Sequence, residues 1–185
     1  MKTFVRLALI SAALAALPAQ AYVLTNTAGL FTSEAGAVTF ATFDAPDLVA
    51  IGTASGGLTN SGSDPGGGGN WRSAGNDLVV TVNFANLTDY FGLLWGTNDG
   101  SQNVIDLYSG ATLVGSINGN AVTGFTNIYA SNAAEFFDSA VLRATFSGCC
   151  FEFDNFAARG VPEPAPIALV GAALFALGLS RRRWV

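Results

Sequence analysis

The chain has 185 residues, which is enough for one domain with a sizeable core, and a net charge of −5 from 8 basic and 13 acidic residues. It contains no histidine, which excludes Ser-His-Asp and Cys-His catalysis and every histidine metal site. Lys2 is its only lysine, so Schiff-base chemistry in the rest of the chain is excluded as well.

Residues 1–21 have the pattern of a secretory signal peptide. Two basic residues precede a short apolar stretch, and small residues stand at Ala19 and Ala21, where signal peptidase requires them. We expect signal peptidase to cleave after Ala21 and to leave Tyr22 as the first mature residue. The pattern therefore predicts export through an inner membrane.

Residues 161–185 contain three elements in a fixed order. A proline-rich motif comes first, an uncharged apolar stretch follows over residues 165–180, and a basic cluster ends the stretch; the motif is Val161, Pro162, Glu163 and Pro164, and the cluster is Arg181, Arg182 and Arg183. The prolines favour extended backbone, the apolar stretch is predicted to be a membrane helix, and arginines resist transfer across a bilayer. At ~1.5 Å per helical residue the apolar stretch reaches ~24 Å, less than the ~30 Å hydrocarbon core.

These three elements resemble the PEP-CTERM sorting tail of exported proteins from Gram-negative bacteria. The resemblance implies that an exosortase, an integral membrane enzyme, recognises the tail and removes it. The protein would be anchored transiently and then reach the cell envelope, the surface or the medium. The alternative is an ordinary C-terminal anchor that is kept.

The part between the two targeting segments is strongly acidic. Between Tyr22 and Pro164 only Arg72, Arg143 and Arg159 oppose all 13 acidic residues, so the charge is 3 − 13 = −10. Such a surface lacks the basic patch that nucleic acids and anionic lipids require. We therefore expect no nucleic-acid partner.

Residues 22–160 are predicted to form one all-β domain. Leu78, Val80, Val82 and Phe84 alternate with more polar residues, the period of a half-buried strand. Further strands are expected at Tyr90–Gly96, Val104–Tyr108, Ala111–Ile117, Phe125–Ala130, Ser139–Phe146 and Phe151–Ala157, with weaker candidates at Val38–Phe43 and Leu48–Ile51. Ser109 and Gly110 stand at hairpin spacing. Short strands at this spacing predict an antiparallel β-sandwich, of the jelly-roll kind.

Residues 52–76 interrupt this rhythm with many glycines and serines. We interpret them as one long glycine-rich surface loop that carries Trp71. An exposed indole can stack on a sugar ring, so Trp71 is a candidate carbohydrate contact, and its alternative role is to close the end of the sandwich. Trp95 alternates with Phe91 and Leu93 and is expected in the core.

Three segments, Tyr90–Gly96, Leu107–Gly110 and Phe151–Ala157, resemble a common ectodomain type of PEP-CTERM proteins. The resemblance covers residues 38–158. It implies a lectin-like or carbohydrate-binding sandwich and identifies no specific ligand.

Two groups of acidic residues are candidate ligand contacts. Glu152 and Asp154 lie two apart on one strand face, which we expect to be solvated; a divalent-ion site and a glycosidase pair are the alternatives. Asp99 lies in residues 98–103, a segment rich in side-chain oxygens. We predict that this segment forms a turn, and a calcium site is the alternative. No cofactor and no other metal are predicted.

Cys149 and Cys150 are adjacent, which leaves three arrangements open in an oxidising envelope. They could form a vicinal disulfide, remain as two thiols, or bond to another chain. A vicinal disulfide would close a strained ring and distort the strand.

The sequence favours a non-enzymatic exported surface or matrix protein that is associated with exopolysaccharide or biofilm. A carbohydrate-binding module is the alternative, and a glycan hydrolase that uses Glu152 and Asp154 is the third possibility. Signal peptidase, an exosortase and an exopolysaccharide are the expected partners.

Overall fold

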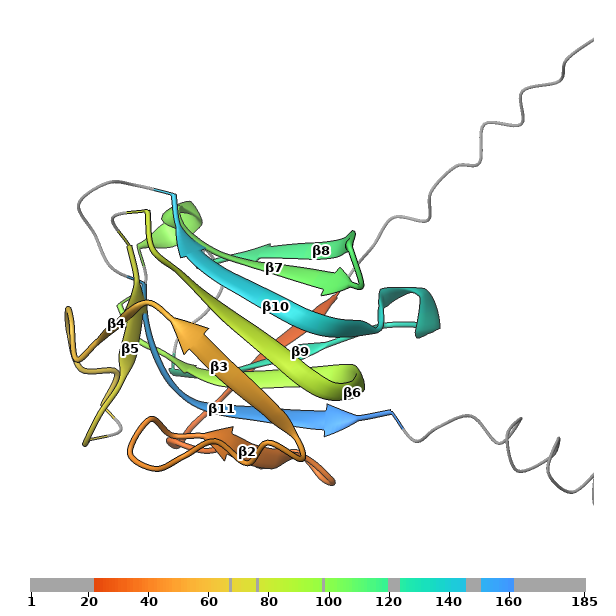
Figure 1. The fold of residues 1–185 in the computed structure, drawn as a ribbon, viewed down its shortest axis with the longest axis horizontal. Helices are drawn as coiled ribbons and strands as arrows, with labels where there is room; N and C mark the ends of the chain where they lie inside the picture. Colours follow the sequence, from red (N-terminus) through yellow and green to blue (C-terminus); the bar gives the residue numbers. More distant parts are fainter. Residues whose placement is uncertain are drawn as a thin grey trace, which may run out of the picture.

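The computed structural model describes residues 22–66, 68–75, 77–97, 99–119, 124–145 and 151–161. These residues form an all-β, antiparallel fold that is consistent with a β-sandwich (Figure 1). The eleven strands within them are β1 (Val23–Thr27), β2 (Val38–Ala41), β3 (Gly52–Gly56), β4 (Leu58–Thr59), β5 (Arg72–Ala74), β6 (Val79–Trp95), β7 (Asn103–Ser109), β8 (Thr112–Asn118), β9 (Gly124–Tyr129), β10 (Phe137–Ala144) and β11 (Phe151–Gly160). The predicted signal helix and C-terminal membrane helix lie outside the described residues, and no helix within those residues is long and apolar enough to cross a membrane.

The 17-residue strand β6 organises the fold because it belongs to two groups of strands. Its first part, residues 79–84, pairs with β3 and β10, while its last part, residues 90–95, pairs with β9 and β11. Figure 1 shows β6 turning back between these parts. The turn brings the rings of Phe84 and Phe91 to 5.4 Å between centroids. The two strands expected at Leu78–Phe84 and Tyr90–Gly96 are thus one bent strand.

An aromatic core fills the space between the two groups of strands. Phe84 contacts both Phe91 and Phe137 edge to face, and the Trp95 ring centre lies 4.2 Å from that of Phe151. All five side chains are buried, so the prediction that Trp95 belongs to the core is confirmed. Each such ring contributes roughly 2–3 kcal/mol by burial, before the added preference for edge-to-face contacts.

The predicted alternation in the first part of β6 is confirmed with one exception. Val80, Val82 and Phe84 are buried, but Leu78 is 42% exposed. Leu78 lies just before the strand, in an isolated bridge with Gly75, and the continuous pairing of β6 begins only at Val79.

A second apolar cluster lies on the opposite face of β6, β9 and β11. It consists of Tyr90, Leu94, Phe125 and Ala157, and residues 28–37 cross over it. Ala37 packs against the cluster, and the Leu30 carbonyl accepts a hydrogen bond from Asn155 Nδ2 at 3.0 Å. The second part of β6 is therefore buried on both faces, which is why its six residues 90–95 show no polar alternation.

The prediction of a structureless loop over residues 52–76 is wrong, because three strands lie within it. β3 pairs with β6, β4 pairs with β5, and β5 pairs with β11. These strands consist mostly of small residues and carry no alternating large apolar side chains. Close packing requires this: a Cβ added to Gly52 would lie only 3.0 Å from the Asn83 carbonyl oxygen and 3.1 Å from the Phe40 ring. Among the described residues, the part of this segment without strands is reduced to residues 57, 60–66, 68–71 and 75.

The remaining strands agree with the sequence apart from two differences. Leu48–Ile51 is a turn, in which Ile51 N donates to the Leu48 carbonyl at 2.8 Å, and β1 was not predicted. β1 lies at an edge and pairs only with β9, so its short polar sequence needs little burial. The hairpin between β7 and β8 is confirmed, with Gly110 at a φ of +58°.

Candidate functional site

The end of the fold near β4 and β5 holds two buried carboxylates beneath a glycine-rich loop. We define the covering loop as residues 60–66 and 68–71. β11 places Glu152 and Asp154 on the face opposite to Phe151 and Phe153, where they are only 3% and 2% exposed. The expectation of a solvated face is therefore wrong, because the covering loop folds back onto this part of β11.

Glu152 is enclosed by backbone from two sides. Its Oε1 accepts a hydrogen bond from Ser63 N at 3.2 Å, and its carbonyl accepts one from Gly96 N at 2.8 Å. A Cβ added to Gly96 would lie 2.7 Å from the Glu152 Cβ, so only glycine fits beneath the side chain. Burial raises the pKa of Glu152, and the charge of Asp99 raises it further.

Asp154 has the more strongly perturbed acidity. Burial raises its pKa to about 7, and the negative charges of Asp44 and Asp64 act in the same direction. The hydrogen bond that Oδ1 accepts from Asn155 N at 2.7 Å opposes this shift only partly. Asp154 therefore holds a proton under mildly acidic conditions and can donate it near neutral pH.

Asp44 and Asp64 belong to this cluster although they lie far from β11 in the sequence. Asp44 Oδ1 accepts hydrogen bonds from Asn70 N at 2.7 Å and from Asn70 Nδ2 at 3.2 Å. Asp64 Oδ1 accepts one from Gly66 N at 2.7 Å, an Asx-type turn. Sequence reasoning missed both residues, because Asp44 comes close to Asp154 through the pairing of β2 with β11, and Asp64 through the folding of the covering loop.

Trp71 closes the base of the covering loop. Its backbone N–H donates to Asn60 Oδ1 at 2.9 Å, and its backbone carbonyl accepts from Asn60 N at 2.8 Å. The indole is half-buried, so it is less exposed than a free platform would be. Its Nε1 is buried and has no hydrogen-bond partner among the described residues.

Five more buried polar side-chain atoms lack partners among those residues, and two of the five lie on neighbouring strands at this site. These two are Glu152 Oε2 and Ser73 Oγ, and Ser73 lies directly opposite Glu152 in the pairing of β5 with β11. The two side chains share one sheet face, so the site offers an acceptor and a hydroxyl that the described protein does not satisfy.

Asp99 lies close enough to Glu152 for its charge to act on that carboxyl, and it begins a short turn. Its carbonyl accepts from Gln102 N at 3.4 Å, and its Oδ2 accepts from Asn103 Nδ2 at 3.4 Å. The predicted turn is thus confirmed, with a 3₁₀ segment at Gly100–Gln102. In the described ranges no three His, Cys, Asp or Glu side chains are grouped so that they could hold a metal ion, and calcium at residues 98–103 stays an untested alternative.

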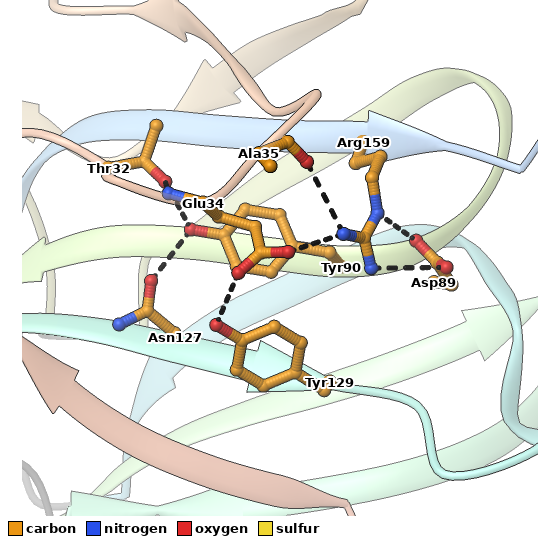
Figure 2. Close-up of polar contacts among 8 residues, drawn as sticks. All are labelled: Thr32, Glu34, Ala35, Asp89, Tyr90, Asn127, Tyr129 and Arg159. Atoms are coloured by element: carbon orange, nitrogen blue, oxygen red, sulfur yellow. Dashed lines mark hydrogen bonds and ion pairs between the residues drawn. The ribbon is translucent and has the colours of Figure 1, made fainter.

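A second polar cluster lies where β11 leaves the fold, and Figure 2 shows its contacts. Arg159 donates to both Asp89 oxygens, from Nε at 3.0 Å and from Nη2 at 3.2 Å. Its Nη1 also contacts the Glu34 carboxylate and the Ala35 carbonyl, and the guanidinium lies 5.7 Å from the Tyr90 ring centre. The hydrogen bonds to Asp89 contribute most to raising the pKa of Arg159.

Tyrosine hydroxyls extend this cluster into the sheet. Tyr129 OH donates to Glu34 Oε2 at 2.9 Å, and Tyr90 OH donates to Asn127 Oδ1 at 2.8 Å. Because Tyr90 has one proton, the Thr32 hydroxyl, 2.7 Å away, donates to it. Burial raises the pKa of Tyr90 to about 12. These groups satisfy one another, so the cluster fixes residues 32–35 to the sheet.

The chain stays bonded to the sheet until the first residue of the predicted sorting motif. Gly160 is paired with Thr88, and Val161 N donates to the Leu87 carbonyl at 2.7 Å. The other motif residues (Pro162, Glu163, Pro164 and Arg181–Arg183), the cleavage residues Ala19 and Ala21, and Cys149 and Cys150 lie outside the described residues.

Comparison with protein-family models, with curated proteins and with solved structures gives no match.

Proposed function

We propose that this chain is a non-enzymatic exported surface or matrix protein, held briefly by its C-terminal tail and released by an exosortase. The observation that carries the proposal is the bond from Val161 N to the Leu87 carbonyl. Because β11 is paired up to Gly160, residues 162–164 follow the fold with no linker in the sequence. A processing enzyme in the membrane would then meet its motif at the edge of a folded domain.

Further support comes from composition and fold. The part between the targeting segments has only three arginines against 13 acidic residues, which suits a soluble protein in a hydrated polysaccharide. We propose that the antiparallel strands form a sandwich of the jelly-roll kind, with β6 shared between its two sheets. Exopolysaccharide is the proposed surrounding material.

Mass spectrometry of the mature protein tests this proposal. The full chain is expressed in a Gram-negative host that has an exosortase, and the protein outside the cell is analysed intact. We expect a product that begins at Tyr22 and ends near the Val161–Pro164 motif. Pro162→Ala with Pro164→Ala should leave the protein in the membrane fraction, whereas Pro166→Ala, outside the motif, should be processed normally. Recovery of external protein that still carries Trp184 and Val185 would refute the trimming proposal.

Carbohydrate binding is a second candidate function, favoured by the position of Trp71. Its indole stands at the base of a loop that also presents Asn60 and Asn70, side chains able to bond sugar hydroxyls. Trp71→Ala should reduce retention on the polysaccharide of the host, and Phe31→Ala, which removes an exposed ring elsewhere, should not. Equal retention of both variants and the wild type would exclude Trp71 as the contact.

A glycan hydrolase requires a protonated acid close to a carboxylate, and the raised pKa values of Asp154 and Glu152 are compatible with that role. The covering loop buries both groups, so it would have to open for substrate. A Glu152→Gln, Asp154→Asn double variant with undiminished turnover of glycans would remove this candidate.

A further inference from the structure

One end of the fold carries exposed apolar side chains on two neighbouring turns. Leu48 and Val49, in the turn before β3, are 52% and 71% exposed, and Leu87, in the bend of β6, is 43% exposed. The two turns are in contact, because Ala85 N donates to the Ile51 carbonyl at 3.0 Å. We call Leu48, Val49 and Leu87 the apolar end.

The chain leaves the domain at this same place. Val161 N donates to the Leu87 carbonyl, and a Cβ added to Gly160 would lie 3.5 Å from that of Asn86. In Figure 1 the end of β11 lies beside the bend of β6, on the side away from β4 and β5. The uncharged stretch that begins at Ala165 therefore follows within a few residues of the apolar end.

The length of chain after Val161 limits how far the domain can stand from a membrane. From Val161 to Ile167 there are six residue steps, which span at most ~20 Å when fully extended. That distance is smaller than a domain of this size, so a tail inserted in a bilayer would hold the neighbouring surface close to the lipid.

Two carboxylates of this end have hydrogen-bond partners, which lowers the cost of bringing them towards an uncharged lipid surface. Asp89 is paired with Arg159, and Asp47 Oδ2 accepts a hydrogen bond from Ala54 N at 2.6 Å. The exposed residues of the β6 bend, Ala85 to Leu87, have no charge.

We propose that the apolar end rests on the interface of the lipid bilayer for as long as the C-terminal tail is inserted. This inference depends on the proposed function, because it requires the tail to act as a membrane tether. Leu48, Val49 and Leu87 would enter the boundary between headgroups and acyl chains and fix the orientation of the domain. The covering loop, beside β4 and β5, would then point away from the membrane.

Photo-crosslinking from lipid tests this orientation. The full chain with its tail is reconstituted in phosphatidylcholine vesicles that contain lipids with a photoreactive acyl chain, and the labelled peptides are mapped by mass spectrometry. We expect label in the tail, and several-fold more label at residues 48–51 and 85–87 than at Leu58, Leu78 and Val79. The latter three lie at the opposite end of the fold, where they are 38–42% exposed, close to the 43% of Leu87, and serve as an internal control.

Two variants complete the test. Leu48→Ser, Val49→Ser, Leu87→Ser should lose the label in residues 48–51 and 85–87 and keep it in the tail, whereas Leu58→Ser, Leu78→Ser, Val79→Ser should match the wild type. Label in the tail alone, or equal label at both ends, overturns the proposed orientation and leaves the tether intact. An unlabelled tail refutes the tether itself, and with it the orientation. A dimer that the first variant dissociates, without lipid label at the apolar end, would assign this surface to a second copy instead.

Discussion

Replacing Asp154 with asparagine should stabilise the domain above pH 7 and have little effect near pH 4. The pKa of Asp154 is raised from its ordinary value of 3.8 to about 7, by burial first and then by Asp44 and Asp64. In the unfolded chain the carboxyl ionises near its ordinary value, so between these two pH values the folded state binds more protons. Stability attributable to Asp154 is therefore complete at low pH and is lost as pH rises from about 4 to about 7.

The size of the effect follows from the shift. A shift of about three pKa units corresponds to about 4 kcal/mol, since each unit is ~1.4 kcal/mol. Solvent screening through the thin covering loop reduces this, and we expect a stabilisation of about 1–2 kcal/mol for Asp154→Asn at pH 8. Asparagine retains an oxygen that can accept from Asn155 N, so this hydrogen bond survives the substitution.

Urea unfolding of the wild type and of Asp154→Asn at pH 4, 6 and 8 measures this difference. Asp77→Asn is the matched control, because Asp77 is exposed and its φ of +66° is one that asparagine tolerates. Comparing variants at each pH cancels the contributions of all other titrating groups, including Glu152, whose pKa is raised in the same direction. A difference between wild type and Asp154→Asn that stays constant from pH 4 to 8 would refute the reasoning.

Three further substitutions test the packing of the two polar clusters. Gly62→Ala should destabilise the domain by about 2 kcal/mol more than Gly66→Ala. Both glycines have φ near +94°, but only a Cβ at Gly62 would clash with the buried Glu152 carboxylate. Urea midpoints that shift equally in the two variants would contradict this. Arg159→Met should cost about 2–3 kcal/mol by leaving two carboxylates without the arginine. Arg143→Met should cost less, about 1–2 kcal/mol, because it leaves one carboxylate, that of Asp106, which keeps its hydrogen bond from Ser116 Oγ at 2.6 Å; urea unfolding measures both. Tyr90→Phe should lower the free energy of unfolding by about 1–2 kcal/mol, since the buried Asn127 Oδ1 and the half-buried Thr32 hydroxyl each lose a hydrogen bond. An unchanged thermal midpoint would exclude the hydroxyl as a structural element.

The strands that could be predicted are those with large alternating side chains. A half-buried strand is indicated by the alternation of Val80, Val82 and Phe84 with more polar residues, because one face of the strand packs on the core and the other does not. β3 could not be predicted in this way, because it lacks large alternating side chains. Gly52 packs so closely against the Phe40 ring that there is no room for a side chain at this position. In such a strand the local sequence is the same as that of a flexible loop.

The candidate site could be predicted only in part, for a related reason. The spacing of Glu152 and Asp154 correctly assigns them to one face of one strand. Whether that face meets water depends on the covering loop, whose position is set by contacts of Ser63 and Asn70 with carboxylates 89 and 26 residues away in the sequence. Burial of the pair is thus a tertiary property, and the pKa shifts that give the site its chemical interest follow from it.

β11 links the two polar clusters to the exit of the chain. Its first residues carry Glu152 and Asp154 beneath the covering loop, its middle contributes Phe153 and Phe156 to the core, and Arg159 fixes its end. It is hydrogen-bonded to β2, β5 and β6, so a pull on the tail is distributed over the central part of the fold. A tether attached to an edge strand could peel that strand from the sheet, whereas here the bonds broken first would be those of Val161 and Gly160, next to the ion pairs of Arg159. The ion pairs of Arg159 with Asp89 and Glu34 therefore lie at the place where a pull from a membrane-held tail would begin to unfold the domain.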